Sequence, residues 1–190
     1  ISDDRITVIP LACDERFFAV RDQSIKNAGL LNELSSPILS RYGISSQSYI
    51  LSVGTLEPRK NIDRLIVAHS TLESSVRSQY PLVIVGKKSW SEVYKDSENV
   101  LFTGFVSDND LPYLYANAKC FVMPSLYEGF GIPVLEAMAS GVPVICSHRS
   151  SLPEIGGDTV TYINDPENTE SIQATLETFF RLSDDELALL

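Results

Sequence analysis

Apolar residues in this chain gather in seven short runs, and most segments between them alternate polar and apolar positions at helical spacing. The runs span residues 6–10, 49–53, 82–85, 100–102, 120–123, 142–146 and 160–163. Runs that are apolar at nearly every position are typical of strands buried on both faces, which occur in parallel sheets. The pattern therefore predicts strands at these positions, with those after residue 48 in one parallel sheet.

Four segments between the runs are predicted as helices, at residues 61–73, 108–118, 132–140 and 167–182. In the second of them we expect Asp108 as the N-cap, with Leu111, Leu114 and Tyr115 forming an apolar face. Strands that alternate with helices are typical of an α/β fold with helices on both sides of the sheet. We therefore expect a Rossmann-like, doubly wound domain from about residue 48 to residue 182.

The first 47 residues are less regular. We expect a strand at residues 6–10, a turn at 14–17, a mobile loop at 21–34 and a helix end capped by Gly43. The chain begins at Ile1 and stops within an apparent helix at residues 184–190. Both ends indicate a fragment or a processed piece of a longer protein.

Composition narrows the class of protein. The 190 residues are 44% hydrophobic and 21% charged, which is ordinary for a globular protein. No apolar run approaches the ~20 residues of a membrane span, and no signal peptide is visible, so we expect a cytoplasmic protein. The net charge of −10 disfavours a nucleic-acid surface. Cys120 and Cys146 lie in apolar runs, which favours buried free thiols, and the three cysteines and two histidines lack the spacing of a zinc site.

Two basic pairs follow predicted strands, Arg59-Lys60 after the second strand and Lys87-Lys88 after the third. Salt screening confines electric fields to roughly 8–10 Å, so a positive site can exist in an acidic protein. An isolated Arg-Lys pair is usually a solvated turn, but this one is followed by Asn61 and a helix start, which favours a phosphate site. For Lys87 and Lys88 a surface turn explains the sequence equally well.

The segment at residues 128–136 places two carboxylates around a strand–helix junction. Gly129 and Gly131 allow close approach of the backbone to a ligand, and a helix N-terminus attracts phosphate. Glu128 and Glu136 can accept hydrogen bonds from hydroxyl groups on either side of that anion. A nucleotide-sugar has this layout, with a diphosphate between a sugar and a ribose. Because ligands in such sheets bind at the carboxyl ends of the strands, we expect these segments to converge.

From about residue 6 to residue 180 the chain resembles the donor-binding, C-terminal half of retaining glycosyltransferases of the GT-B architecture, family four. Five segments in this order carry the resemblance, at residues 52–61, 82–88, 102–106, 125–139 and 150–154. The resemblance implies an interdomain connector and N-terminal extension at 1–47, a nucleotide-sugar domain at 48–182, and the start of a truncated helix at 183–190.

The resemblance also assigns roles to residues. Arg59 and Lys60 hold the donor diphosphate and stabilise it as the leaving group, and Glu136 takes the ribose hydroxyls. Glu128 lies by the transferred sugar, where it either positions the sugar or stabilises positive charge at the anomeric carbon. Glu128, Arg59 and Lys60 are thus the catalytic candidates. The donor-binding candidates are Gly54, Arg59, Lys60, Gly86, Lys87, Phe105, Val106, Glu128, Gly129, Phe130, Gly131, Ile132 and Glu136.

The motif variants most resemble mannosyltransferases that use GDP-mannose, with UDP-glucose as the second choice. Retaining transfer then needs an acceptor hydroxyl held by an absent N-terminal domain, so we expect the isolated domain to be inactive. A lipid-linked acceptor would bring the full enzyme to the inner membrane face. We expect no cofactor and no metal. Asp108-Asn109-Asp110 matches the Asp-x-Asp motif with which glycosyltransferases of the other main architecture bind a metal, but its position at a helix start is explained by capping.

Two other functions fit the same residues: a non-catalytic nucleotide-sugar-binding module, and a sugar-nucleotide epimerase of related fold. Ser150, Ser151 and Glu154 follow the strand that ends at Cys146. For these three residues, capping of a loop is favoured over a place in the site.

Overall fold

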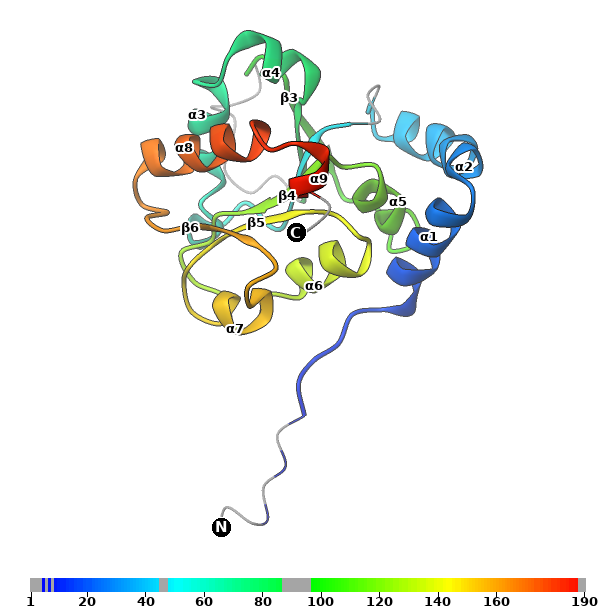
Figure 1. Ribbon diagram of the computed structural model, residues 1–190, viewed down its shortest axis with the longest axis horizontal. Coiled ribbons are helices and arrows are strands. Elements are labelled where there is room, and N and C mark those ends of the chain that lie inside the picture. Colours follow the sequence, from blue (N-terminus) through cyan, green and yellow to red (C-terminus); the bar gives the residue numbers. More distant parts are fainter. Residues whose placement is uncertain (1–4, 6, 8, 45–47, 87–96, 188–190) are drawn as a thin grey trace.

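The computed structural model describes residues 5, 7, 9–44, 48–86 and 97–187. A six-stranded parallel sheet forms its centre, with helices on both faces (Figure 1). The strand order is β3-β2-β1-β4-β5-β6, which is the order of the Rossmann fold, so the predicted fold class is confirmed. The strands are β1 (Ile50–Val53), β2 (Leu82–Val85), β3 (Val100–Gly104), β4 (Cys120–Met123), β5 (Val144–Ser147) and β6 (Thr161–Ile163).

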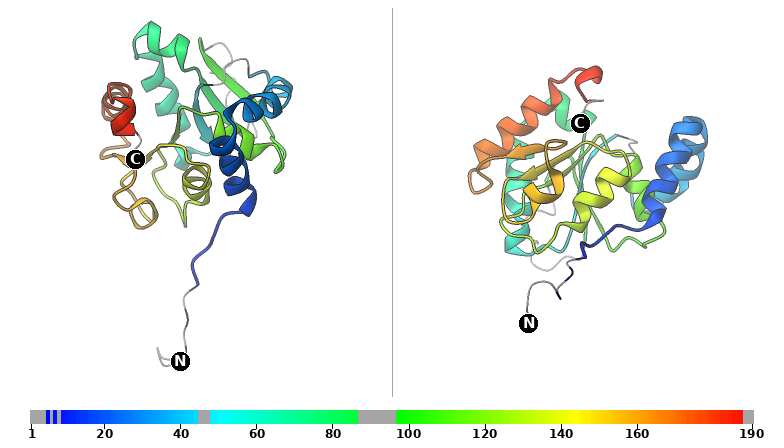
Figure 2. Two further views of the ribbon diagram at one scale, coloured as in Figure 1. Left: turned by 45° about the vertical axis from the view of Figure 1, so that its right-hand side comes forward. Right: turned by 60° about the horizontal axis from the view of Figure 1, so that its bottom comes forward.

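Successive side chains of a strand point to opposite faces of the sheet. Because these side chains are apolar on both faces, helices cover both. Leu51 and Phe121 pack in one core with α1, α5 and α6, whereas Ile50 and Val122 pack in a second core with α3 and α8. Figure 2 shows α8 and the α1–α2 pair on opposite sides of the sheet. The helices are α1 (Glu15–Lys26), α2 (Ala28–Arg41), α3 (Ile62–Ser70), α4 (Ser74–Gln79), α5 (Leu111–Ala116), α6 (Ile132–Ala139), α7 (Leu152–Gly156), α8 (Thr169–Phe180) and α9 (Asp184–Leu187), with a 3-10 turn η2 (Pro58–Lys60).

The strand order places β1 beside β4, although the two strands are far apart in the chain. From β1 the sheet grows toward β3 on one side, and from β4 it grows toward β6 on the other. In sheets of this kind a crevice forms at the carboxyl ends of the two strands where the order reverses. The fold therefore singles out the β1 loop (residues 54–61) and the β4 loop (residues 124–131).

The expectations for the N-terminal region need correction. Thr7, Ile9 and Pro10 form no strand, and the other two residues of that predicted run lie outside the described residues. The predicted turn at 14–17 and the predicted mobile loop at 21–34 are wrong, because α1 and α2 occupy them. Within α2, Ser35 is fully buried and accepts a hydrogen bond from Asn117 at 2.9 Å. A polar residue on the buried face interrupts the apolar pattern.

The end of α2 was predicted correctly. Gly43 has φ 74°, and the N–H of Ile44 donates to the carbonyl of Leu39 at 3.0 Å. These are the features of a glycine-terminated helix, in which the glycine adopts a left-handed conformation. The predicted buried free thiols are also confirmed, since Cys120 and Cys146 are buried and unpaired.

The predicted N-cap of α5 was wrong by two residues. The helix begins at Leu111, and its N-cap Asp110 makes no side-chain cap. The Asp110 carboxylate instead accepts from the Tyr42 hydroxyl at 2.7 Å and from Arg41 at 3.3 Å, which ties α5 to the end of α2. Leu114 is fully buried, as the predicted apolar face requires.

Candidate functional site

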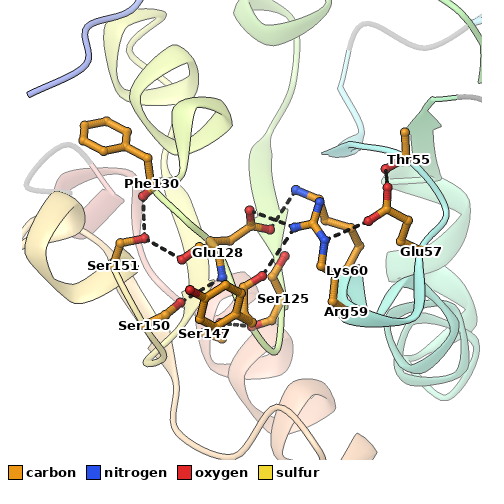
Figure 3. Close-up of polar contacts among 11 residues, drawn as sticks. Thr55, Glu57, Arg59, Lys60, Ser125, Glu128, Phe130, Ser147, Ser150 and Ser151 are labelled. Atoms are coloured by element: carbon orange, nitrogen blue, oxygen red, sulfur yellow. Dashed lines mark hydrogen bonds and ion pairs between the residues drawn. The ribbon is translucent and has the colours of Figure 1, made fainter.

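The β1 and β4 loops are joined by a three-residue ion cluster. Lys60 Nζ donates to Glu128 Oε1 at 2.7 Å, and Arg59 Nη1 donates to Glu128 Oε2 at 3.3 Å (Figure 3). The side chains of Lys60 and Glu128 are only 11% and 7% exposed, whereas that of Arg59 is 43% exposed. Lys60 is therefore committed to the buried carboxylate, while the guanidinium of Arg59 still reaches solvent.

Glu57 orients the guanidinium of Arg59 from the other side. Arg59 Nε donates to Glu57 Oε2 at 2.7 Å, and the Thr55 hydroxyl donates to Glu57 Oε1 at 2.7 Å. The Thr55 hydroxyl, followed by Arg59, lowers the pKa of Glu57. The charged hydrogen bonds of Nε to Glu57 and of Nη1 to Glu128 fix the plane of the guanidinium.

Asn61 joins the β1 loop to two other segments. Its backbone is left-handed, with φ 59°, a conformation that asparagine tolerates better than most residues. The side-chain amide donates to the carbonyls of Pro124 at 3.0 Å and Pro166 at 2.7 Å. In addition, the N–H of Leu126 donates to the carbonyl of Arg59 at 2.7 Å. The position of the basic pair therefore depends on backbone contacts as well as on the ion cluster.

Two of the candidate glycines, Gly54 and Gly86, lie side by side at the carboxyl edge of the sheet. A Cβ on Gly86 would lie 1.9 Å from the carbonyl oxygen of Gly54, so only glycine fits where these two strand ends meet. A Cβ on Gly54 would lie 3.4 Å from Cε of Lys60, which passes directly over it. Gly86 thus has a clear packing role, whereas Gly54 lies at ordinary contact distance from the Lys60 side chain that binds Glu128.

The β4 loop leads into the N-terminus of α6. Gly131 is the N-cap with φ 108°, and a Cβ there would lie 2.7 Å from Leu152. A Cβ on Gly129 would meet nothing within 4 Å, and Ile132 in the first turn is 37% exposed. The first N–H groups of a helix have no partner within it and carry partial positive charge. This end of α6 is therefore chemically suited to an anion.

Glu136 lies in a different environment, on α6 beyond the first turn. It is half-buried and accepts a hydrogen bond from the Tyr115 hydroxyl at 2.9 Å. Burial raises its pKa, the nearby carboxylates of Asp108 and Asp14 add to that effect, and the Tyr115 hydroxyl opposes it. In the described part of the chain no cation pairs with Glu136, and it makes no recorded contact with the ion cluster.

The remaining candidates are spread more widely. Phe130 is half-buried beside Gly129 in the β4 loop. Phe105, just after β3, is 72% exposed, whereas its neighbour Val106 is buried in the core. Lys87, like Lys88 and Trp90, lies outside the described residues. Within those residues, no group of three or more His, Cys, Asp or Glu side chains is arranged to hold a metal ion. Donor binding without a metal stays a prediction.

Sequence reasoning missed Tyr115 as the partner of Glu136 and Glu57 as the residue that orients Arg59. Tyr115 was assigned only to an apolar face, yet a buried tyrosine hydroxyl almost always has a hydrogen-bond partner. That rule points to an unidentified polar partner for Tyr115. The spacing of Glu57 and Arg59 gives no comparable indication, because many exposed pairs of this kind never form.

Solved structures share this fold. WaaG, described as a glycosyltransferase involved in lipopolysaccharide biosynthesis, has a TM-score of 0.77 and 24% identity, covering 99% of this chain and 50% of WaaG. HepE of Anabaena, solved in complex with UDP-glucose, has a TM-score of 0.65 and 20% identity, covering 82% of this chain and 45% of HepE. At these identities the likeness establishes the fold alone. The fold is that of one half of a GT-B glycosyltransferase.

Sequence comparison gives the family. Residues 40–188 match the family described as glycosyl transferases group 1. O-antigen chain mannosyltransferase B of Escherichia coli is 44% identical over 146 residues, which are 73% of this chain and 38% of that protein. The serotype-specific mannosyltransferase WbdA of Escherichia coli is 35% identical over 187 residues, 93% of this chain and 22% of that protein.

The chain belongs to the glycosyl transferases group 1 family, and the resemblance inferred from its motifs is confirmed. It spans well under half of the length of these two relatives. None of the helices in the described ranges is long and apolar enough to cross a membrane.

Proposed function

We propose that this chain is the donor-binding domain of a retaining mannosyltransferase whose donor is GDP-mannose. The acceptor hydroxyl is held by an N-terminal domain of the same full-length protein. Arg59 and Lys60 stabilise the diphosphate as it leaves, Glu136 accepts the ribose hydroxyls, and Glu128 lies beside the transferred sugar. The role of Glu128 is either to position that sugar or to stabilise charge at its anomeric carbon.

One observation carries the proposal: the ion cluster joins the two loops at the point where the strand order reverses. Preorganised cations stabilise developing negative charge without reorganising during the reaction, and this is often the largest single contribution to catalysis. Arg59 is the better placed cation for the phosphates, because it is half-exposed and oriented by Glu57. Lys60 reaches a phosphate only if it shares its ammonium between the ligand and Glu128.

The relatives support the choice of sugar. Both sequence relatives described above carry mannosyltransferase in their names, and one is an O-antigen chain enzyme. HepE, in contrast, was solved with UDP-glucose, which keeps that donor as the second candidate. Synthesis of a bacterial polysaccharide is therefore the process in which we place the full-length protein. The cytoplasmic location, the inner-membrane attachment and the domain boundary near residue 47 stay predictions.

A titration of the 190-residue chain with GDP and UDP tests the proposal. We expect GDP to bind more tightly, and Arg59→Ala to weaken GDP binding by ~1.5–3 kcal/mol, the scale of a charged hydrogen bond. Arg181→Ala is the matched control, since Arg181 is 79% exposed and pairs with Glu177 on α8. Equal GDP affinity for wild type and Arg59→Ala would contradict the phosphate role of Arg59.

A pair of glycine variants tests the position of the ligand. Gly129→Ala places its methyl in open space, so we expect unchanged stability but weaker GDP binding. Gly131→Ala places its methyl 2.7 Å from Leu152 in a left-handed backbone, so we expect loss of stability as well. Thermal unfolding and titration separate the two effects. Full GDP affinity in Gly129→Ala would place the donor elsewhere.

The two rival functions differ in products. A non-catalytic module binds the nucleotide-sugar but transfers nothing in the full-length protein, and an epimerase converts the donor without an acceptor. Incubation of the full-length protein with GDP-mannose, with and without a glycan acceptor, distinguishes them. Acceptor-dependent release of GDP with retained anomeric configuration is the result that we expect.

A further inference from the structure

The β4 loop is held in place by serines that belong to the next strand–helix junction. The Ser150 hydroxyl accepts from the N–H of Glu128 at 2.9 Å. The Ser151 hydroxyl lies 2.7 Å from the carbonyl oxygen of Phe130 and 3.2 Å from that of Glu128, and donates to them. The Ser147 hydroxyl donates to the carbonyl of Ser125. Figure 3 shows these contacts together.

Ser151 departs from the usual behaviour of a serine at its position. It is the N-cap of α7, where a serine hydroxyl normally accepts a hydrogen bond from its own helix. Here it makes no side-chain cap and is directed to the β4 loop instead. Ser150 is also unusual, because its backbone is left-handed with φ 47°. Serine seldom adopts this conformation, which here accompanies the contact between its hydroxyl and Glu128.

The contacts fix the peptide groups on both sides of Glu128. Ser150 binds the N–H of the peptide before Glu128, and Ser151 binds the carbonyl of the peptide after it. These contacts therefore fix the orientation of the backbone from which the Glu128 side chain projects. In Figure 3, Ser151 and the Arg59–Lys60 pair lie on opposite sides of Glu128.

The two Ser151 contacts also orient two N–H groups. In a trans peptide the C=O and N–H point in opposite directions, and the described chain has no cis peptide. The Phe130 carbonyl points to Ser151, so the N–H of Gly131 points away from it. The weaker contact of the Glu128 carbonyl with Ser151 turns the N–H of Gly129 in the same sense. For neither N–H does the described part of the chain record a protein acceptor.

We propose that Ser150 and Ser151 are positioning residues, which set the β4 loop so that Gly129 and Gly131 present their N–H groups to the diphosphate of the donor. The inference rests on the proposed function and gives these serines a part in it. Their contact is with the loop and not with the ligand. A rotation of either peptide by loss of its serine contact replaces an N–H that attracts phosphate with a carbonyl that repels it.

The test compares two ligands that differ only in the diphosphate, GDP and guanosine (or UDP and uridine, if wild type prefers UDP). We expect Ser151→Ala to weaken GDP binding about three- to tenfold, which is the loss of one hydrogen bond, and to leave guanosine binding unchanged. Ser151→Thr keeps the hydroxyl and should bind GDP like wild type. A purely structural role for Ser151 would weaken both ligands equally, and that result would overturn the inference.

Two further variants complete the design. Thr159→Val is the matched control, because it removes a hydroxyl that donates to the Gly156 carbonyl at 3.0 Å, at the far end of α7. Ser150→Gly removes the second contact while relieving its left-handed backbone, and it provides the test if Ser151→Ala fails to fold. If Ser150→Gly folds and binds GDP as tightly as wild type does, the inference is wrong, but the proposed function is not affected. A wild-type chain that binds neither GDP nor UDP contradicts the proposed function and, with it, the inference.

Discussion

Glu128 and Glu136 are separated by seven residues, but the regions around them are chemically opposite. Around Glu128, both carboxylate oxygens are bound by cations from another loop. Around Glu136, the only recorded partner in the described chain is the neutral hydroxyl of Tyr115, and the neighbouring charges are the carboxylates of Asp14 and Asp108.

Within the described residues, the negative charge of Glu128 is balanced by nearby cations, whereas that of Glu136 is not. The charge of Glu128 can stay buried because Lys60 is buried with it. Glu136 bears a burial cost that only a hydrogen bond offsets, so its pKa is raised. A ligand hydroxyl that donates to Glu136 would supply the missing stabilisation. The charge of Glu128 is thus balanced within the protein, whereas under the proposed function a ligand hydroxyl would complete the environment of Glu136.

The largest effect is expected from removing the compensation of Glu128. Lys60→Met keeps the length of the side chain but leaves Glu128 with Arg59 alone. Breaking a buried pair in this way costs about 3 kcal/mol of the free energy of unfolding. Urea unfolding measures that loss. The double variant Lys60→Met with Glu128→Gln should recover part of it, and a loss below ~1 kcal/mol in the single variant would show that the two regions do not differ as described.

A smaller effect is expected from the region around Glu136. Tyr115→Phe keeps the ring against Phe17 and Phe121 but removes the hydrogen bond to the carboxylate. We expect a loss of about 1–2 kcal/mol in the free energy of unfolding, because a half-buried charge then lacks its donor. A double-mutant cycle of Tyr115→Phe and Glu136→Gln isolates the interaction between the two side chains. Strictly additive losses would mean that the hydrogen bond contributes nothing.

The smallest effect is expected in how the free energy of unfolding depends on pH, compared between wild type and Glu136→Gln. Burial raises the pKa of Glu136 in the folded chain above its ordinary value of 4.5. Its favourable contribution is therefore fully present below the ordinary pKa and is lost as the pH rises through the raised, folded-state pKa. Glu136→Gln cannot ionise, so wild type should lose stability relative to this variant as the pH rises above the ordinary pKa of 4.5. Urea unfolding at a series of pH values on both sides of that pKa gives the two curves, and parallel curves would contradict the raised pKa.

The sheet itself could be predicted from short runs of apolar residues, because strands covered on both faces leave little room for polar side chains. The prediction was wrong for α1 and α2, where Ser35 occupies a buried position and finds its partner in Asn117, 82 residues away. It was also wrong for Asp108, because Asp110, two residues further on, is the N-cap of α5. At Ser35 in α2 and at Asp110 of α5, a polar residue is satisfied by a distant segment rather than by its own helix.

The candidate site shows the same division between local and distant causes. The proximity of Arg59 and Lys60 to the segment from Glu128 onward follows from the rule for strand ends, and the structure brings them together. No spacing rule indicates that Lys60 faces Glu128, or that Ser150 and Ser151 bind the β4 loop. These contacts join segments that the strand order makes neighbours.

By itself, the sequence determined the family, the parallel sheet and the residues that cluster at its carboxyl edge, because these depend on local hydrophobicity and on motifs of a few residues. Only the tertiary structure decided which charge meets which. Glu128 is paired with two cations and Glu136 with a hydroxyl, since electrostatic pairing depends on distances of a few ångströms between segments that lie far apart in the chain.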